Sequence, residues 1–129
     1  MLHNGTLVLN KETFYSTTDE EKKQARRVII EEGVTTLGIG AFADSPNLTE
    51  VILPETLTDL GFATFMNCHN LQRINIPDNI KEIPQMTFYR CSSLTKIELP
   101  GELEEIYLGA FFGCCNLRYI ALPDSVKTV

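Results

Sequence analysis

Hydrophobic residues recur along most of this chain at one fixed interval. Pro54, Pro77, Pro100 and Pro123 are each separated by 23 residues, and aliphatic residues keep the same step in several columns. Two of these columns are Val51, Ile74, Ile97, Ile120 and Leu53, Ile76, Leu99, Leu122, and an aromatic column holds Phe42, Phe65, Phe88, Phe111. A fixed period of roughly 20 to 50 residues is typical of a solenoid, whose units bury their apolar sides only by stacking. The pattern therefore predicts stacked coils over residues 28–129.

Each repeat contains a short stretch in which hydrophobic and polar residues alternate. In "LQRINIP", Ile74 and Ile76 alternate with the polar Arg73 and Asn75. This period of two predicts a short strand with its aliphatic side chains inward, and the following proline ends it because proline has no amide hydrogen to donate. The next stretch, "NIKEI", predicts a second short extended segment. Segments such as "GIGAFADSPN" predict a helical turn or tight corner around one inward phenylalanine.

The repeat also follows a recognisable consensus. The stretch "VTTLGIGAFADSPNLTEVILP" and its copies fit the pattern L-x-x-I-x-I-P-x-x-L-x-x-I-G-x-x-A-F-x-x-C. This pattern resembles the BspA-like leucine-rich repeats of bacteria over residues 28–129, and "NGTLVLN" is similar to the strand motif that often precedes such arrays. The resemblance implies a right-handed, β-rich leucine-rich-repeat superhelix with one short parallel strand and a helical turn or corner per coil.

The expected organisation is one domain over residues 1–129. Residues 1–27 would form an N-terminal strand and cap, and residues 28–129 the repeats, with an incomplete last coil. A chain of 129 residues suffices for one core but not for two typical domains. The resemblance further implies a surface or secreted protein that binds proteins or host matrix.

Charge and hydropathy narrow the expected partners and location. The chain has 11 basic and 17 acidic residues, a net charge of −6, which disfavours nucleic acid as a partner. No apolar run reaches the ~18 residues of a membrane helix, so membrane insertion is not expected. Because "MLHNGTLVLN" lacks the features of a secretory leader, the expected location is cytoplasmic, whereas the resemblance allows export if the chain is part of a longer precursor.

The cysteines and histidines offer little chemistry. Cys68, Cys91 and Cys114 share one column, and a straight ladder of single thiols provides neither the tetrahedral geometry of zinc nor the facing Cβ vectors of a disulfide. We expect these three thiols to be buried as small hydrophobes and Cys115 to be exposed. His3 and His69 have no adjacent carboxylate pattern, and no phosphate loop or nucleophile motif occurs. The sequence therefore predicts no metal, no cofactor and no enzymatic activity.

The outward positions of the strands are the candidate binding site. Parallel stacking aligns them in rows, and solenoids bind partners on such extended faces. The predicted partner-binding residues are Arg27, Ile29, Glu50, Ile52, Arg73, Asn75, Lys96, Glu98 and Tyr119. We expect a protein–protein interaction module that uses this strand face. A structural, self-assembling repeat unit and a glycan- or matrix-binding surface domain remain alternatives.

Two apolar sets are candidates for further interfaces. An exposed strand edge with apolar side chains invites pairing with another copy, and a two-fold contact closes where a head-to-tail contact would not. The expected homodimer uses the C-terminal coil, through Phe112, Leu117, Ile120, Leu122, Val126 and Val129. A second set lies outside the core columns and predicts another interface; it comprises the column Ile39, Phe62, Gln85 and Leu108, with Met66, Tyr89 and Phe112 nearby.

Overall fold

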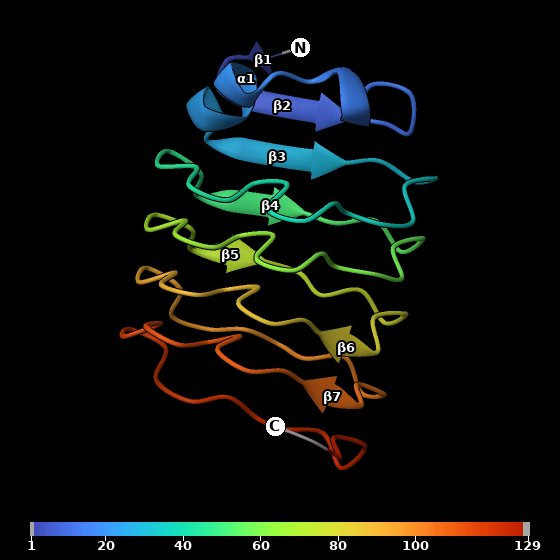
Figure 1. Cartoon of the computed structure of the whole chain (residues 1–129), viewed down its shortest axis with the longest axis vertical. Coiled ribbons are helices and arrows are strands. Elements are labelled where there is room, and N and C mark those ends of the chain that lie inside the picture. Colours follow the sequence, from blue (N-terminus) through green and yellow to red (C-terminus); the bar gives the residue numbers. More distant parts are fainter. Residues whose placement is uncertain (1, 128–129) are drawn as a thin grey trace.

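The computed structural model describes residues 2–127 of the chain. Its coils are stacked along one axis, with the N-terminus at one end and the C-terminus at the other (Figure 1). In chain order, the elements are β1 (Leu2–His3), β2 (Thr6–Leu9), the 3-10 helix η1 (Phe14–Ser16), α1 (Asp19–Gln24), β3 (Arg27–Ile30), β4 (Glu50–Ile52), β5 (Arg73–Ile74), β6 (Glu82–Ile83) and β7 (Glu105–Ile106).

Two faces of the stack are built from parallel strands. The first face, hereafter the strand face, contains a sheet of order β1-β2-β3-β4-β5, in which only β1 and β2 are antiparallel. Arg27 pairs with Glu50 and Glu50 with Arg73, so the register equals the sequence repeat. The second face contains the β6–β7 pair and, among the earlier coils, a parallel bridge between Thr36 and Asp59. The second extended segment predicted for each repeat is therefore present in four coils, as the Thr36–Asp59 bridge and the β6–β7 pair.

The third face, hereafter the turn face, is made of tight turns. Two columns in these turns have left-handed backbone: Gly40, Ala63, Met86, Gly109 and Asp44, Asn67, Arg90, Gly113. Between them, the N–H of Phe42 donates to the carbonyl of Thr64 at 2.9 Å, and that of Phe65 to Thr87 at 3.0 Å. The turns thus bond one coil to the next. Within residues 2–127, helix occurs only as η1 and α1, so the predicted corner is a turn rather than a helix.

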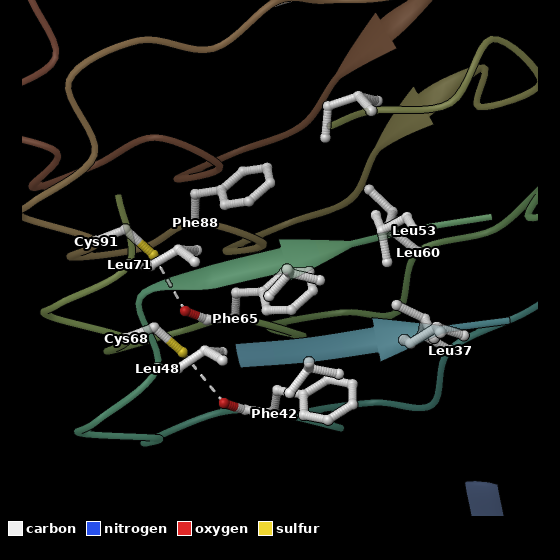
Figure 2. Close-up of a cluster of buried hydrophobic side chains, with 14 of the residues drawn as sticks. Leu37, Phe42, Leu48, Leu53, Leu60, Phe65, Cys68, Leu71, Phe88 and Cys91 are labelled. Carbon is white, nitrogen blue, oxygen red and sulfur yellow. Dashed lines mark hydrogen bonds between the residues drawn. The ribbon is translucent and has the colours of Figure 1, made fainter. Parts of the chain in front are cut away.

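Phenylalanine and cysteine columns fill the core (Figure 2). The rings of Phe42, Phe65, Phe88 and Phe111 form a stack with successive centroid separations of 5.8, 5.8 and 5.5 Å. Beside them, Cys68 Sγ donates to the carbonyl of Phe42 at 3.1 Å, and Cys91 Sγ to that of Phe65 at 3.1 Å. All four cysteines are free, with Cys115 alone exposed, which confirms the prediction.

The N-terminal segment covers the first coil. The strand expected in "GTLVL" is β2, which pairs in parallel with β3 from Thr6 to Leu9. A capping box begins α1, because Thr18 accepts from the N–H of Glu21 while the Glu21 carboxylate accepts from the N–H of Thr18. Lys22 Nζ lies 5.4 Å from the centroid of the Phe42 ring and so closes the aromatic column at this end.

The strand ladder is shorter than the repeat predicts. In the fourth and fifth repeats, residues 94–99 and 117–122 keep the apolar columns but form no strand in the described part of the chain. Leu94 is buried like Leu48 and Leu71, and Ile97 is buried like Val51. In the fourth repeat the side chains therefore keep their inward register where the backbone ladder stops, whereas in the fifth repeat Leu117 and Ile120 are only partly buried.

Candidate functional site

Alternating charges run across the strand face at the level of Arg27. Arg27 Nε lies 3.0 Å from Glu50 Oε1, and Arg73 Nε lies 3.7 Å from Glu50 Oε2. One carboxylate thus bridges two guanidinium groups from neighbouring coils. Exposed pairs of this kind contribute little to folding stability, so their main effect is on the electrostatic pattern of the surface.

This alternation ends between Arg73 and Lys96. These two cations occupy the same position in successive coils, and Lys96 pairs instead with Glu98 of its own coil at 3.6 Å. In the preceding step, the N–H of Gln72 donates to Thr49 at 2.9 Å; no such backbone bond joins 72–76 to 95–99 within residues 2–127. Like charges therefore occupy equivalent positions where the ladder is interrupted.

An asparagine anchor is also missing at this step. The amide nitrogens of Asn47, Asn70 and Asn116 donate to main-chain carbonyls of the preceding coil, at 3.1, 2.6 and 2.6 Å. The equivalent position in the interrupted step is Ser93, whose side chain is too short to make this bond. Both the charge repulsion and the lost anchor disfavour the ladder at this step. Within residues 2–127 the next step, from 95–99 to 118–122, also lacks backbone bonds, but there Asn116 keeps its anchor.

The separation is confined to the strand face. The same two coils remain bonded on the turn face, where the N–H of Phe65 donates to Thr87 at 3.0 Å. On the opposite side they are joined by the β6–β7 pair, and Cys91 Sγ bonds to the carbonyl of Phe65. The two coils are therefore bonded to each other on two faces and, among the described residues, lack backbone bonds only on the strand face.

The opening is a hollow of about 630 Å³, hereafter the strand-face hollow, lined by both segments and by β4. Six predicted partner-binding residues lie together here: Glu50, Ile52, Arg73, Asn75, Lys96 and Glu98. Gln72 and Thr95, which were not among the predicted site residues, complete the polar rim, while the partly buried Ile74 adds apolar surface above the buried Val51. The alternation of polar and apolar residues predicted which of these side chains point outward. It did not predict that the backbone ladder ends here and that the side chains therefore line one hollow.

The remaining predicted partner-binding residues lie next to this hollow. Arg27 is joined to it through Glu50, and Ile29 pairs in register with Ile52. Tyr119 is 74% exposed and lines a smaller hollow of about 260 Å³ together with Lys96 and Glu98. The nine residues therefore form one continuous surface.

Asn75 has an additional structural role. Its side-chain oxygen accepts from the N–H of Leu53 at 2.8 Å, and its amide nitrogen donates to the carbonyl of Leu53 at 2.9 Å. The side chain thereby replaces the backbone ladder between β4 and the end of β5. Its amide is already engaged, so its expected contribution to partner recognition is smaller than that of Arg73 or Lys96.

The two apolar sets differ in exposure. Ile39 and Leu108 are 80% and 77% exposed, and Phe112 stacks on Tyr89 with a centroid separation of 5.3 Å. In the C-terminal set, Phe112 and Leu122 are exposed, whereas Leu117, Ile120 and Val126 are partly buried against the core. Val129 lies outside the described residues.

Catalytic and metal-binding arrangements are sparse in the described part of the chain. Residues 2–127 contain no group of three or more His, Cys, Asp or Glu side chains placed to hold a metal ion. Glu82 and Glu105 pair in register across β6–β7, and burial, followed by the charge of Glu105, raises the pKa of Glu82. This carboxylate pair was not predicted, although the 23-residue separation of Glu82 and Glu105 places them in one column. No helix within residues 2–127 is both long and apolar enough to span a membrane.

The stacked 23-residue coils, the parallel strand face and the buried leucine and phenylalanine columns define a leucine-rich-repeat solenoid. The family model for the BspA type leucine rich repeat region matches residues 8–129 in six copies. The chain belongs to this family. The match begins within the segment that we expected to be an N-terminal cap, so repeat-like sequence extends into that segment.

Solved bacterial structures share the fold. A leucine rich cell surface protein from Faecalibacterium prausnitzii is 36% identical over 78% of this chain, with a TM-score of 0.76. A leucine-rich repeat protein from Bacteroides ovatus is 38% identical over 74% of the chain, with a TM-score of 0.72, and one from T. pallidum is 27% identical over 100%, with a TM-score of 0.80. This chain spans only 27%, 25% and 59% of those three proteins. No curated relative matches it significantly.

Proposed function

We propose that the chain is a non-catalytic interaction module that binds a protein partner across its strand face. The observation that carries this proposal is the strand-face hollow, which gathers six outward residues from successive coils. The F. prausnitzii protein is described as a cell surface protein, and a surface role within a longer exported protein is part of the proposal.

The chemistry of the face suits a protein partner. Arg73 and Lys96 supply exposed cations and Glu98 an exposed anion beside apolar surface from the partly buried Ile52 and Ile74. Charges at the rim favour encounter and orientation, while apolar contacts contribute affinity. The net charge of −6 opposes nucleic acid on the same face. The intact turn face holds these groups on a rigid scaffold.

The test is photo-crosslinking in extracts of the native host, with a photoreactive residue placed at Thr95. A strand-face variant, Arg73→Ala with Lys96→Ala and Tyr119→Ala, is compared with the wild type. The matched control changes Lys11, Lys23 and Tyr15 to alanine, because these residues lie in the N-terminal segment, away from the hollow. We expect the strand-face variant to lose specific protein adducts with an unchanged melting temperature, and the control variant to keep them. Adducts that survive the strand-face changes would contradict the proposal.

Self-association is the second candidate function, and one observation favours it. Phe112 is 60% exposed and Leu122 is 47% exposed, and both belong to the C-terminal set for which we expected a homodimer. A second copy of the chain would cover these side chains. Light scattering of the purified chain provides the test, described with the other predictions below.

A further inference from the structure

We propose that the gap between β5 and residues 95–99 accepts an extended acidic peptide, which adds a strand to the interrupted ladder. The inference rests on the proposed function, because it names the kind of partner that the strand face binds. The opening is internal to the stack and lies between coils that remain bonded on both other faces.

The backbone on both sides of the gap is available for such a strand. In the two coil-to-coil steps before the gap, the N–H of Thr49 donates to the carbonyl of Arg26 at 2.7 Å, and the N–H of Gln72 donates to the carbonyl of Thr49 at 2.9 Å. Within residues 2–127, neither 72–76 nor 95–99 has a main-chain partner across the gap. An extended peptide carries donors and acceptors along both edges, and strand addition uses such free edges for affinity. At ~3.3 Å per residue, about five peptide residues would match residues 95–99.

The outward charges specify the peptide further. From the first coil onward, the row runs Arg27, Glu50, Arg73, and then another cation, Lys96. Glu50 forms ion pairs with the arginines on both its sides. A peptide that places a glutamate or aspartate between Arg73 and Lys96 would restore the alternation and offset their repulsion. A lysine in that position would place three cations in one row.

The inward positions favour an apolar peptide residue next to the acid. Ile74 lies on one side of the gap and is only partly buried, while Ile97 belongs to the buried core on the other side. Because successive side chains of a strand point to opposite faces, the neighbour of the acid on the Ile74 and Ile97 side would point toward these two isoleucines, and its other neighbour would lie level with Gln72 and Thr95. An apolar residue on each side of the acid meets this requirement in either strand direction, so the expected recognition pattern is apolar, acidic, apolar.

The probe is the blocked pentapeptide acetyl-Thr-Val-Glu-Val-Thr-amide. One matched peptide has lysine in place of glutamate, and another has both valine nitrogens methylated, which removes backbone donors without removing charge. Binding is measured by calorimetry at low salt, and amide hydrogen exchange is followed for 72–76 and 95–99. We expect the glutamate peptide to bind at least tenfold more tightly than either matched peptide and to slow exchange in both segments.

A variant that closes the gap provides the second arm. Ser93→Asn with Lys96→Glu restores the asparagine anchor and the alternating charges, so it should reduce affinity for the glutamate peptide at least tenfold. Lys23→Glu, placed on α1, changes the net charge equally and should leave binding intact. A closed-gap variant that binds as well as the wild type would overturn the proposal.

The remaining outcomes separate this inference from the proposed function. Equal binding of the three peptides, or no binding of any, would overturn strand addition. Binding of cellohexaose in place of the peptides would show a glycan cleft and would likewise overturn it. If strand addition fails while the Arg73, Lys96 and Tyr119 changes still abolish protein adducts, the strand face binds a partner by another mode and the proposed function stands.

Discussion

The buried cysteine column makes the fold sensitive to alkaline pH. Burial raises the pKa of Cys68 to about 12 and that of Cys114 to about 11, and it raises the pKa of Cys91 as well. Each thiol donates to a phenylalanine carbonyl of the preceding coil, so its proton also links two coils. An unfolded chain releases these protons near pKa ~8.5.

The size of the effect follows from proton linkage. Above pH ~8.5 the unfolded state releases protons that the folded state keeps, so the free energy of unfolding falls by ~1.4 kcal/mol per pH unit for each thiol. At pH 10 this amounts to about 2 kcal/mol per thiol, or about 6 kcal/mol for the column. A whole domain commonly has only about 5 to 15 kcal/mol of stability. The stabilisation is complete below pH ~8.5 and is lost as the pH rises toward the folded pKa values.

The assay is urea unfolding followed by circular dichroism at pH 7.5, 9 and 10. The wild type is compared with the triple variant Cys68→Ala, Cys91→Ala and Cys114→Ala, and with Cys115→Ala as the exposed control. We expect the wild type and the control to lose stability steeply above pH 9, while the triple variant starts lower but declines much less. Equal pH slopes in all three proteins would refute the reasoning, because the buried thiols would then not release protons on unfolding.

The other predictions concern packing and association. Phe88→Ala removes a fully buried ring stacked on both sides, so urea unfolding should show a loss of about 3 to 5 kcal/mol; the half-buried Tyr89→Ala should cost far less, and equal costs would contradict a packed aromatic column. A methyl group on Gly61 would collide with the backbone of Gly38, whereas one on Gly38 meets open space. Gly61→Ala should therefore cost roughly 1 to 3 kcal/mol and Gly38→Ala less than ~1 kcal/mol. Thermal melting of the two variants checks this order, and a Gly38→Ala variant that melts below Gly61→Ala would contradict it. If the C-terminal set pairs two copies, light scattering at micromolar concentration should give twice the chain mass. Leu122→Asp should reduce the measured mass to that of a single chain, and a wild-type monomer would exclude the dimer.

The sequence predicts the parts of this fold that repeat. The 23-residue step was sufficient to predict the columns, the core phenylalanines and the inward thiols, because identical positions in stacked coils have nearly identical surroundings. The strand-face hollow depends instead on departures from the repeat. Ser93 in place of asparagine and Lys96 beside Arg73 each weaken one coil contact, and whether the ladder opens depends on the balance with contacts on the other two faces. A periodic pattern cannot supply that balance.

The interruption of the ladder also explains where the predicted site was incomplete. Alternation identified Arg73, Lys96 and Glu98 as outward, but it could not show that Gln72 and Thr95 would share their hollow. It also could not show that the Asn75 amide would bond to the backbone of Leu53, since that contact replaces a main-chain pair 22 residues away. Side chains that replace backbone are invisible to a pattern of hydrophobic and polar positions.

The peptide groups of the turn face give the stack a dipole along its axis. Gly40, Phe42 and Asp44 donate their N–H groups to the following coil, and the equivalent donors in the next two coils do the same. Aligned peptide dipoles add, as they do in a helix, so this face carries partial positive charge toward its C-terminal end. Whatever packs against residues 109–113, a further coil or another molecule, must therefore present carbonyl or carboxylate oxygens there. The stack can be extended in that direction only by a segment that accepts hydrogen bonds.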